Sequence, residues 1–210
     1  LNDTDSGNLL RHADQALYQA KQTGRNRYCL FDISLDKEVR FLYQEQERIS
    51  QALEQGEMEL YYQPKVNMRT GEAFGFEALL RWNHPERGLV MPMEYLPLIE
   101  QTDLIMDIGM WVMREALRQL AAWREEGLNT KVSINLGACH FRNMAFVGQL
   151  QDVLAQYPTV PPSALELEIL ECAALDDIKM VRAIMLGCQE LGVTFALDDF
   201  GAGYSSLAYL

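Results

Sequence analysis

The sequence alternates between short apolar strands and amphipathic helices, and this alternation constrains the fold more than any other feature. From residue 58 onward the expected strands are 58–62, 74–82, 131–136, 164–170 and 193–198. The helices expected between them are 93–101, 104–126, 146–156 and 176–191. Pro64 is expected to end the first strand, and Gly71 to turn the chain into the second. Repeated alternation of this kind predicts an α/β fold with a mainly parallel sheet and flanking helices.

The first 56 residues form two further segments. Residues 9–21 carry apolar side chains at helical spacing, and residues 28–31 follow as a short strand. One helix and one strand cannot enclose a core, so we expect residues 1–32 to be the end of a domain whose body lies upstream. Residues 33–56 are mostly polar and predict a connecting helix, which is either a plain spacer or a signalling lever. Residues 57–210 form the main domain.

Composition excludes several functions. The 210 residues include 18 Lys plus Arg and 30 Asp plus Glu, a net charge of −12, so polymeric nucleic acid is not an expected partner. With 49% hydrophobic residues the chain can form a substantial core. The longest charge-free run, 153–165, contains three prolines and is too short to span a bilayer. We expect a cytoplasmic piece without direct membrane contact, while an upstream membrane tether of the parent protein stays open.

Polar side chains recur on one face of the expected strands. Successive side chains of a strand point to opposite faces, so residues two apart share a face. The face opposite the aliphatic side chains carries a polar residue near the C-terminal end of each of four strands, namely Glu77, Asn135, Glu168 and Asp198. In a barrel of parallel strands this face is the interior, and active sites form at its C-terminal rim.

Three carboxylates and an amide at one rim indicate a cation site. Converging carboxylates repel one another unless a cation lies among them. All-oxygen ligands favour Mg²⁺, Mn²⁺ or Ca²⁺. Asp199 follows Asp198 directly, and such a pair can serve two ions. The glycine-rich loop 199–206 would lie at the same rim. The alternative is that each acid is a surface or salt-bridged residue, but the shared placement on four strands argues against it.

Six motifs follow one another along the main domain. They are YYQP (61–64), EALLRW (77–82), HPERGLVMP (84–92), SINL (133–136), LELEILE (165–171) and DDFGAGYSSL (198–207). Together they resemble the EAL domain, a family of cyclic-di-GMP-specific phosphodiesterases. The resemblance implies a TIM-like (β/α)8 barrel with an antiparallel first strand. It also implies metal-dependent hydrolysis of cyclic di-GMP to pGpG in bacterial signalling, and a homodimer formed through this domain.

The same resemblance implies roles for particular residues. The implied ligands of two Mg²⁺ or Mn²⁺ ions are Glu77, Asn135, Glu168, Asp198 and Asp199. Gln63 and Arg81 match positions that bind the substrate near its phosphates, and a guanidinium is suited to phosphate oxygens. Glu171 matches a glutamate that supports the loop beginning at Asp199, so Glu77 and Glu171 are the implied catalytic residues. Leu170 and Cys172, on either side of Glu171, replace the small hydroxyl residues usual in the family.

We expect this barrel to be truncated after about the sixth strand. A complete barrel needs roughly 250 residues, and the family's general-base lysine has no match in this sequence. The 210 residues alone are therefore expected to be inactive, and poorly soluble or oligomeric. The segment ADQALYQAKQTGRNRY (13–28) resembles the closing helix and turn of a GGDEF domain, the diguanylate cyclase family. The alternatives are a silent cyclic-di-GMP receptor, a structural relic of a GGDEF–EAL hybrid, or another metal-dependent barrel hydrolase.

Overall fold

The computed structural model describes residues 33–170 and 178–198, with a few isolated positions before residue 33. The chain divides into two units, Leu1–Glu45 and Gln46–Leu210, and the second contains the sheet. The expected helix 9–21 and strand 28–31 fall largely outside the described residues. Glu171, Cys172, Asp199 and the loop 199–206 also lie outside them, as do the side chains of Leu170 and Asp198.

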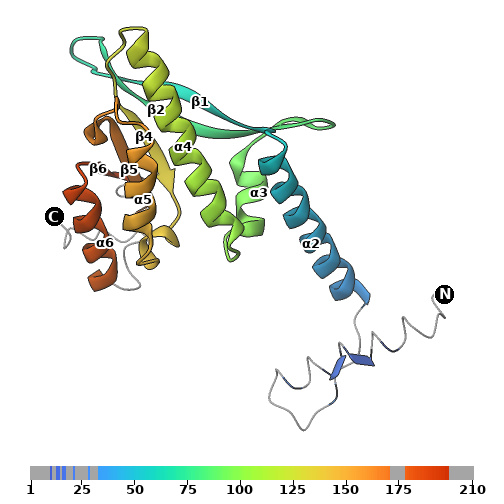
Figure 1. The fold of residues 1–210 in the computed structure, drawn as a ribbon. Coiled ribbons are helices and arrows are strands. Elements are labelled where there is room, and N and C mark those ends of the chain that lie inside the picture. Colours follow the sequence, from blue (N-terminus) through green and yellow to red (C-terminus); the bar gives the residue numbers. More distant parts are fainter. Residues whose placement is uncertain are drawn as a thin grey trace. The chain divides into compact units, whose positions relative to one another are not determined.

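In the described part of the chain, six strands form one sheet in the order β1-β2-β4-β5-β6, with β3 paired to β2 (Figure 1). The strands are β1 (Met58–Val66), β2 (Ala73–His84), β3 (Gly88–Val90), β4 (Val132–Leu136), β5 (Leu165–Leu170) and β6 (Thr194–Asp198). β1 runs antiparallel to β2, whereas β2, β4, β5 and β6 are parallel to one another. The antiparallel first strand and the parallel order that follows are confirmed, and the arrangement is that of a truncated barrel.

The helices lie where the sequence pattern predicts them, to within three residues. They are α2 (Ile33–Glu54), α3 (Pro92–Ile99), α4 (Leu104–Glu125), α5 (Phe146–Ala155) and α6 (Ile178–Glu190). α4, α5 and α6 lie side by side, α4 contacting α5 and α5 contacting α6 (Figure 1). Among the described helices, none has both the length and the apolar character needed to cross a membrane.

The core lies between the sheet and this helical layer. On β4 and β5 every second residue is apolar and almost fully buried, as with Ile134 and Leu167. The facing stripe of α4 is equally buried and includes Met113 and Leu117. Burial of these side chains supplies the main driving force for folding. It also directs the alternate residues of each strand, which are polar, to the other face of the sheet.

Pro64 does not end the first strand, so that prediction is wrong. β1 continues to Val66, and Pro64 lies opposite Phe76 in the ladder with β2. Among the described strands β1 pairs only with β2, so its other edge needs no backbone N–H donor from Pro64. As a result Lys65 is part of the strand and faces the same side as Gln63.

The last turns of α2 are anchored beside the second strand. Ile49 and Ala52 are fully buried in the core. Arg48 donates to Glu57 Oε2 at 2.6 Å, and the indole nitrogen of Trp82 donates to the same oxygen at 2.8 Å. The Arg48 guanidinium also lies 5.2 Å from the centre of the Trp82 ring. These contacts fix the strand segment that carries Arg81.

Candidate metal and phosphate site

The face of the sheet opposite the helices carries polar side chains from four neighbouring strands. They are Gln63 and Lys65 on β1, Glu77 and Arg81 on β2, Ser133 and Asn135 on β4, and Glu166 and Glu168 on β5. They share this face because each pair is two or four residues apart on its strand. The backbone of Asp198, the last residue of β6, lies opposite Leu170 at the same edge of the sheet.

Glu77 and Asn135 are in direct contact. The amide nitrogen Nδ2 of Asn135 donates to Glu77 Oε1 at 2.9 Å. Glu77 lies opposite Ser133 in the parallel ladder, so Asn135 is its diagonal neighbour one step toward the C-terminal edge. Because Nδ2 is engaged with Glu77, the amide oxygen of Asn135 is the atom that can face a cation.

Glu168 is the third oxygen donor of this face, and with Glu77 and Asn135 it forms what we call the cluster. It lies opposite Asn135 in the β4–β5 ladder and is only 6% exposed. Glu77, Asn135 and Glu168 therefore share one face of the sheet, as the strand pattern predicts, and their role as metal ligands stays a prediction. The expectation that all lie at strand ends is wrong for Glu77, which is the fifth of the twelve residues of β2. β2 pairs with β4 only over residues 76–78, and its remainder extends beyond the parallel sheet against β1 and β3.

A lysine lies among these carboxylates. The ammonium Nζ of Lys65 donates to Glu168 Oε1 at 2.5 Å, to Glu166 Oε1 at 3.2 Å and to Ser133 Oγ at 2.6 Å. Ser133 Oγ in turn donates to Glu166 Oε1 at 2.7 Å. Burial alone would lower the pKa of Lys65, but its bonds to Glu168 and Glu166 outweigh burial and raise it. Burial alone would raise the pKa of Glu166, but the hydrogen bonds from Ser133 and Lys65 outweigh burial and lower it.

The two expected phosphate-binding residues flank this cluster. Gln63 is exposed and lies directly opposite Glu77 in the β1–β2 ladder. The Arg81 guanidinium donates to the carbonyl oxygen of Leu80 at 2.8 Å, and its carbon lies 5.8 Å from the centre of the Tyr61 ring. Tyr61 and the backbone therefore orient Arg81 while leaving further N–H donors for a ligand.

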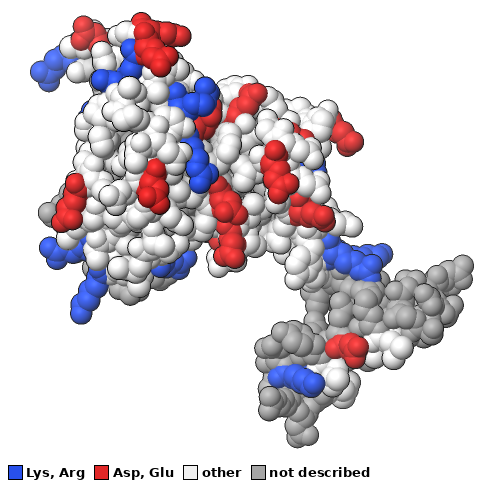
Figure 2. Space-filling view, viewed as in Figure 1, with Lys and Arg blue, Asp and Glu red and all other residues white. Residues whose placement is uncertain are grey.

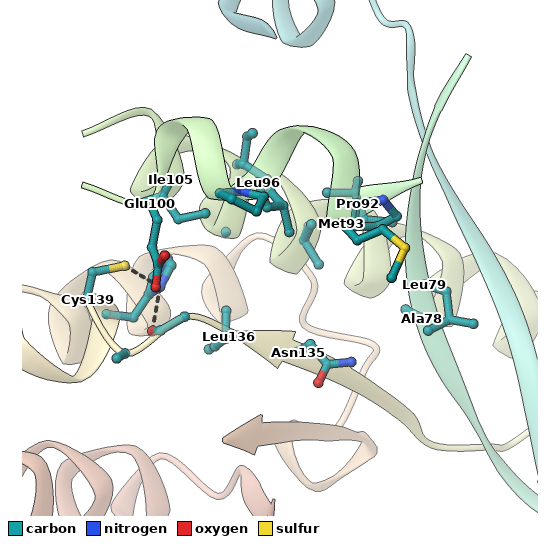
Figure 3. Close-up of a pocket in the computed structure, with 18 of the residues that line it drawn as sticks. Ala78, Leu79, Pro92, Met93, Leu96, Glu100, Ile105, Asn135, Leu136 and Cys139 are labelled. Atoms are coloured by element: carbon teal, nitrogen blue, oxygen red, sulfur yellow. Dashed lines mark hydrogen bonds between the residues drawn. The ribbon is translucent and has the colours of Figure 1, made fainter. Parts of the chain in front are cut away.

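A cavity of about 460 Å³ opens beside Arg81 and Asn135. Its wall is mostly apolar. Figure 3 shows Met93 and Leu96 of α3 on one side and Asn135 and Leu136 of β4 on the other. An apolar hollow with a few polar groups at its edge has the character and size of a small-molecule site.

The donors present fit a hard divalent cation. Glu77, Asn135 and Glu168 offer carboxylate and amide oxygens, which Mg²⁺ and Mn²⁺ prefer. Within the described residues, no three His, Cys, Asp or Glu side chains are grouped closely enough to hold a metal ion. The side chain of Asp198 and the whole of Asp199, which the sequence assigns to the same site, lie outside those residues.

Three residues of this face, Lys65, Ser133 and Glu166, have no role assigned to them from the sequence. The sequence did carry a signal for them. Lys65 lies two residues from Gln63, Ser133 two from Asn135, and Glu166 two from Glu168, so the members of each pair share a face. What the pattern could not show is that the long lysine side chain reaches across to the fourth strand of the sheet.

The visible face of the molecule carries charged side chains of both signs. On the face shown in Figure 2, the described Lys and Arg side chains are interspersed with Asp and Glu rather than gathered into one basic patch. Binding to polymeric DNA or RNA depends on such clustered positive charge. That polymeric nucleic acid is not a partner stays a prediction.

A parallel sheet with an antiparallel first strand, with helices on one face and polar side chains on the other, defines a barrel-type α/β protein. The chain belongs to the EAL domain family, whose sequence model matches residues 46–210. That match begins within α2.

Curated relatives agree with this assignment. The chain is 41% identical over 203 residues to the bifunctional diguanylate cyclase/cyclic di-GMP phosphodiesterase MucR of Pseudomonas aeruginosa, covering 96% of this chain and 30% of that protein. It is 34% identical over 207 residues to the cyclic di-GMP phosphodiesterase PdeR of Escherichia coli, covering 99% and 31%. The chain thus spans about a third of the length of these relatives.

Solved structures show the same fold. The cyclic-di-GMP complex of the MucR phosphodiesterase superposes with a TM-score of 0.74 at 41% identity, covering 79% of this chain and 67% of that one. The EAL enzyme Bd1971, with cAMP and cyclic di-GMP bound, has a TM-score of 0.75 at 29% identity, covering 99% and 55%. These similarities confirm the expected EAL fold.

Proposed function

We propose that this chain supplies part of the active site of a metal-dependent phosphodiesterase that hydrolyses cyclic di-GMP to pGpG. The observation that carries the proposal is the meeting of Glu77, Asn135 and Glu168 on the inner face of the sheet, beside Arg81. The names of the relatives, which include cyclic di-GMP phosphodiesterases, support the same substrate.

Different residues would bind the phosphates and the guanine bases of cyclic di-GMP. Arg81, held by Leu80 and Tyr61, presents N–H donors to phosphate oxygens. Gln63 lies opposite Glu77 on the first strand, four residues beyond the partner of Arg81, and adds a neutral amide. The adjacent apolar cavity of about 460 Å³ offers a surface on which a flat guanine base can be buried.

The carboxylates and the amide would hold the metal ions. Glu77, Asn135, Glu168 and Asp198 are proposed ligands of Mg²⁺ or Mn²⁺, with Asp199 serving a second ion and Glu171 supporting the loop that carries it. When bound, divalent ions activate a water molecule and neutralise charge on the phosphate. Asn135 keeps its amide oxygen turned to the site because Glu77 engages its nitrogen.

The test is turnover of cyclic di-GMP to pGpG by the full-length protein with added Mn²⁺, followed by chromatography. Glu77→Ala should abolish turnover. Glu72→Ala is the matched control, because Glu72 is an exposed carboxylate in the neighbouring hairpin, and it should leave the rate unchanged. Turnover that survives Glu77→Ala would disprove the proposal.

A silent cyclic-di-GMP receptor is the second candidate. It is favoured by the Lys65–Glu168 ion pair, which balances the charge of Glu168 without a divalent ion. Binding of cyclic di-GMP without turnover would support the receptor. A homodimer, the GGDEF-like assignment of residues 1–32, the connecting role of residues 33–56 and the cytoplasmic location stay predictions.

A further inference from the structure

Lys65 on β1 reaches side chains on β4, two strands away, and on β5, three strands away. Lys65 lies opposite Gly75 in the β1–β2 ladder, and directly opposed residues share a face. Because Gly75 has no side chain, nothing on β2 at this level blocks the lysine. Its ammonium therefore extends past β2 to Ser133 on β4 and to Glu166 and Glu168 on β5.

The hydrogen bonding of this ammonium is complete. A lysine has three N–H donors, and all three are used, on Ser133 Oγ, Glu166 Oε1 and Glu168 Oε1. Ser133 is 2% exposed, and its hydroxyl accepts from Lys65 while donating to Glu166. A lysine with every donor assigned to a buried or half-buried group has a defined place in the sheet interior.

The two carboxylates that share Lys65 differ in their surroundings. Glu168 lies opposite Asn135, so it belongs to the proposed cation ligands. Glu166 is two residues earlier on β5. It lies opposite Ser133, which is not one of the proposed cation ligands. The Glu168 side chain is 8% exposed and that of Glu166 is 24% exposed. An uncompensated charge at Glu168 would therefore be the more costly of the two.

We propose that Lys65 is an internal substitute for the divalent cation. Without the cation its ammonium neutralises Glu168 and holds that carboxylate in place. When a divalent ion binds Glu168, the two positive charges repel, and Lys65 keeps its ion pair with Glu166 and its bond to Ser133. Glu166 is thus the acceptor that allows the exchange. This inference rests on the proposed function for the identity of the cation site.

The test is a double-mutant cycle on Mn²⁺ affinity, measured for the full-length protein by following free Mn²⁺ with electron paramagnetic resonance. Lys65→Met removes the competing charge and should tighten Mn²⁺ binding at least threefold. Glu166→Gln removes the alternative acceptor and should weaken binding at least threefold. In the Lys65→Met background, Glu166→Gln should have a clearly smaller effect, because there is no ammonium left to redirect.

A control variant is needed to separate the contact made by Lys65 from the general effect of removing one positive charge. Lys131 is an exposed lysine whose positive charge also acts on Glu166. Lys131→Met should change Mn²⁺ affinity less than twofold. Weaker or unchanged Mn²⁺ binding in Lys65→Met, or strictly additive effects in the cycle, would overturn the exchange. Glu166→Gln preserves side-chain size, so unchanged affinity in that variant alone also overturns it.

A second measurement does not depend on affinity. In EDTA, Lys65→Met should lower the melting temperature because Glu168 loses its counter-charge, and saturating Mn²⁺ should raise it more than in the unmodified protein. An equal Mn²⁺ effect in both proteins would contradict the role of Lys65. The proposed function can be wrong while this inference holds. That would be the case if Lys65 and Glu166 are coupled in Mn²⁺ binding but the protein does not hydrolyse cyclic di-GMP.

Discussion

Asn135 donates a 2.9 Å hydrogen bond to the carboxylate of Glu77, although 58 positions separate the two residues in the sequence. The bond joins the second strand of the sheet to the next parallel strand. Because the bond engages the amide nitrogen with Glu77, the amide oxygen is the atom of Asn135 that could bind a cation.

Replacing this amide with a carboxylate should make the protein depend on metal. Asn135→Asp removes the donor and sets a second negative charge against Glu77. In EDTA we expect the free energy of unfolding to fall by about 1 kcal/mol. Saturating Mn²⁺ should stabilise the variant more than the unmodified protein, as measured by thermal denaturation. A variant as stable as the parent in EDTA would show that the bond contributes nothing to the fold.

Arg81 should contribute strongly to phosphate binding. Its guanidinium is oriented by Leu80 and Tyr61 beside the cavity, and a charge-assisted hydrogen bond contributes about 1.5–3 kcal/mol. Arg81→Ala should therefore weaken cyclic-di-GMP binding tenfold or more in calorimetric titration. Arg87→Ala removes an equal charge from an exposed ion pair with Glu94 and should have little effect. Equal losses in both variants would indicate only a general charge effect.

Gly109 should be intolerant of any side chain. A Cβ at this position of α4 would lie 2.1 Å from Nε2 of His140, a residue that is 1% exposed. Overpacking of this kind costs about 1–3 kcal/mol, so Gly109→Ala should be destabilised by that amount in urea denaturation.

Gly148 in α5 provides the matched control. It has no heavy atom within 4 Å of the added Cβ position. Alanine is the better helix former, so Gly148→Ala should stabilise the protein by up to about 1 kcal/mol. Effects of the same sign at Gly109 and Gly148 would contradict the packing of His140 against α4.

His140 should make the folded protein sensitive to mild acid. Burial lowers its pKa below the ordinary value of 6.5, against the effect of the bond that its Nδ1–H donates to the Gly137 carbonyl. The unfolded chain then binds a proton at a higher pH than the folded one. The resulting stability is fully present above about pH 6.5 and is lost as the pH falls through the folded-state pKa.

This dependence can be measured by chemical denaturation between pH 7 and pH 5. The free energy of unfolding should fall over that interval in the unmodified protein. His140→Asn should be less stable at pH 7 and show a flatter profile. An unchanged slope in that variant would show that another group titrates there.

Several features of the fold could be predicted from local pattern alone. Period-two alternation in β4 and β5 identified which residues face the helices, because burial of Ile134 and Leu167 requires their neighbours to face the other way. The helices from α3 to α6 were located to within three residues by the same kind of argument. Pro64 was misjudged because a proline's effect depends on whether its strand edge needs a donor, and that is decided by the neighbouring strands.

The site divides in the same way. The sequence determined that Glu77, Asn135 and Glu168 share a face, since this follows from strand geometry and motif order. Only the tertiary structure decided that Asn135 donates to Glu77, and that Lys65 pairs with a carboxylate 103 positions away. The register between strands and the reach of a side chain depend on how segments far apart in the sequence pack together. A local sequence pattern does not determine that packing.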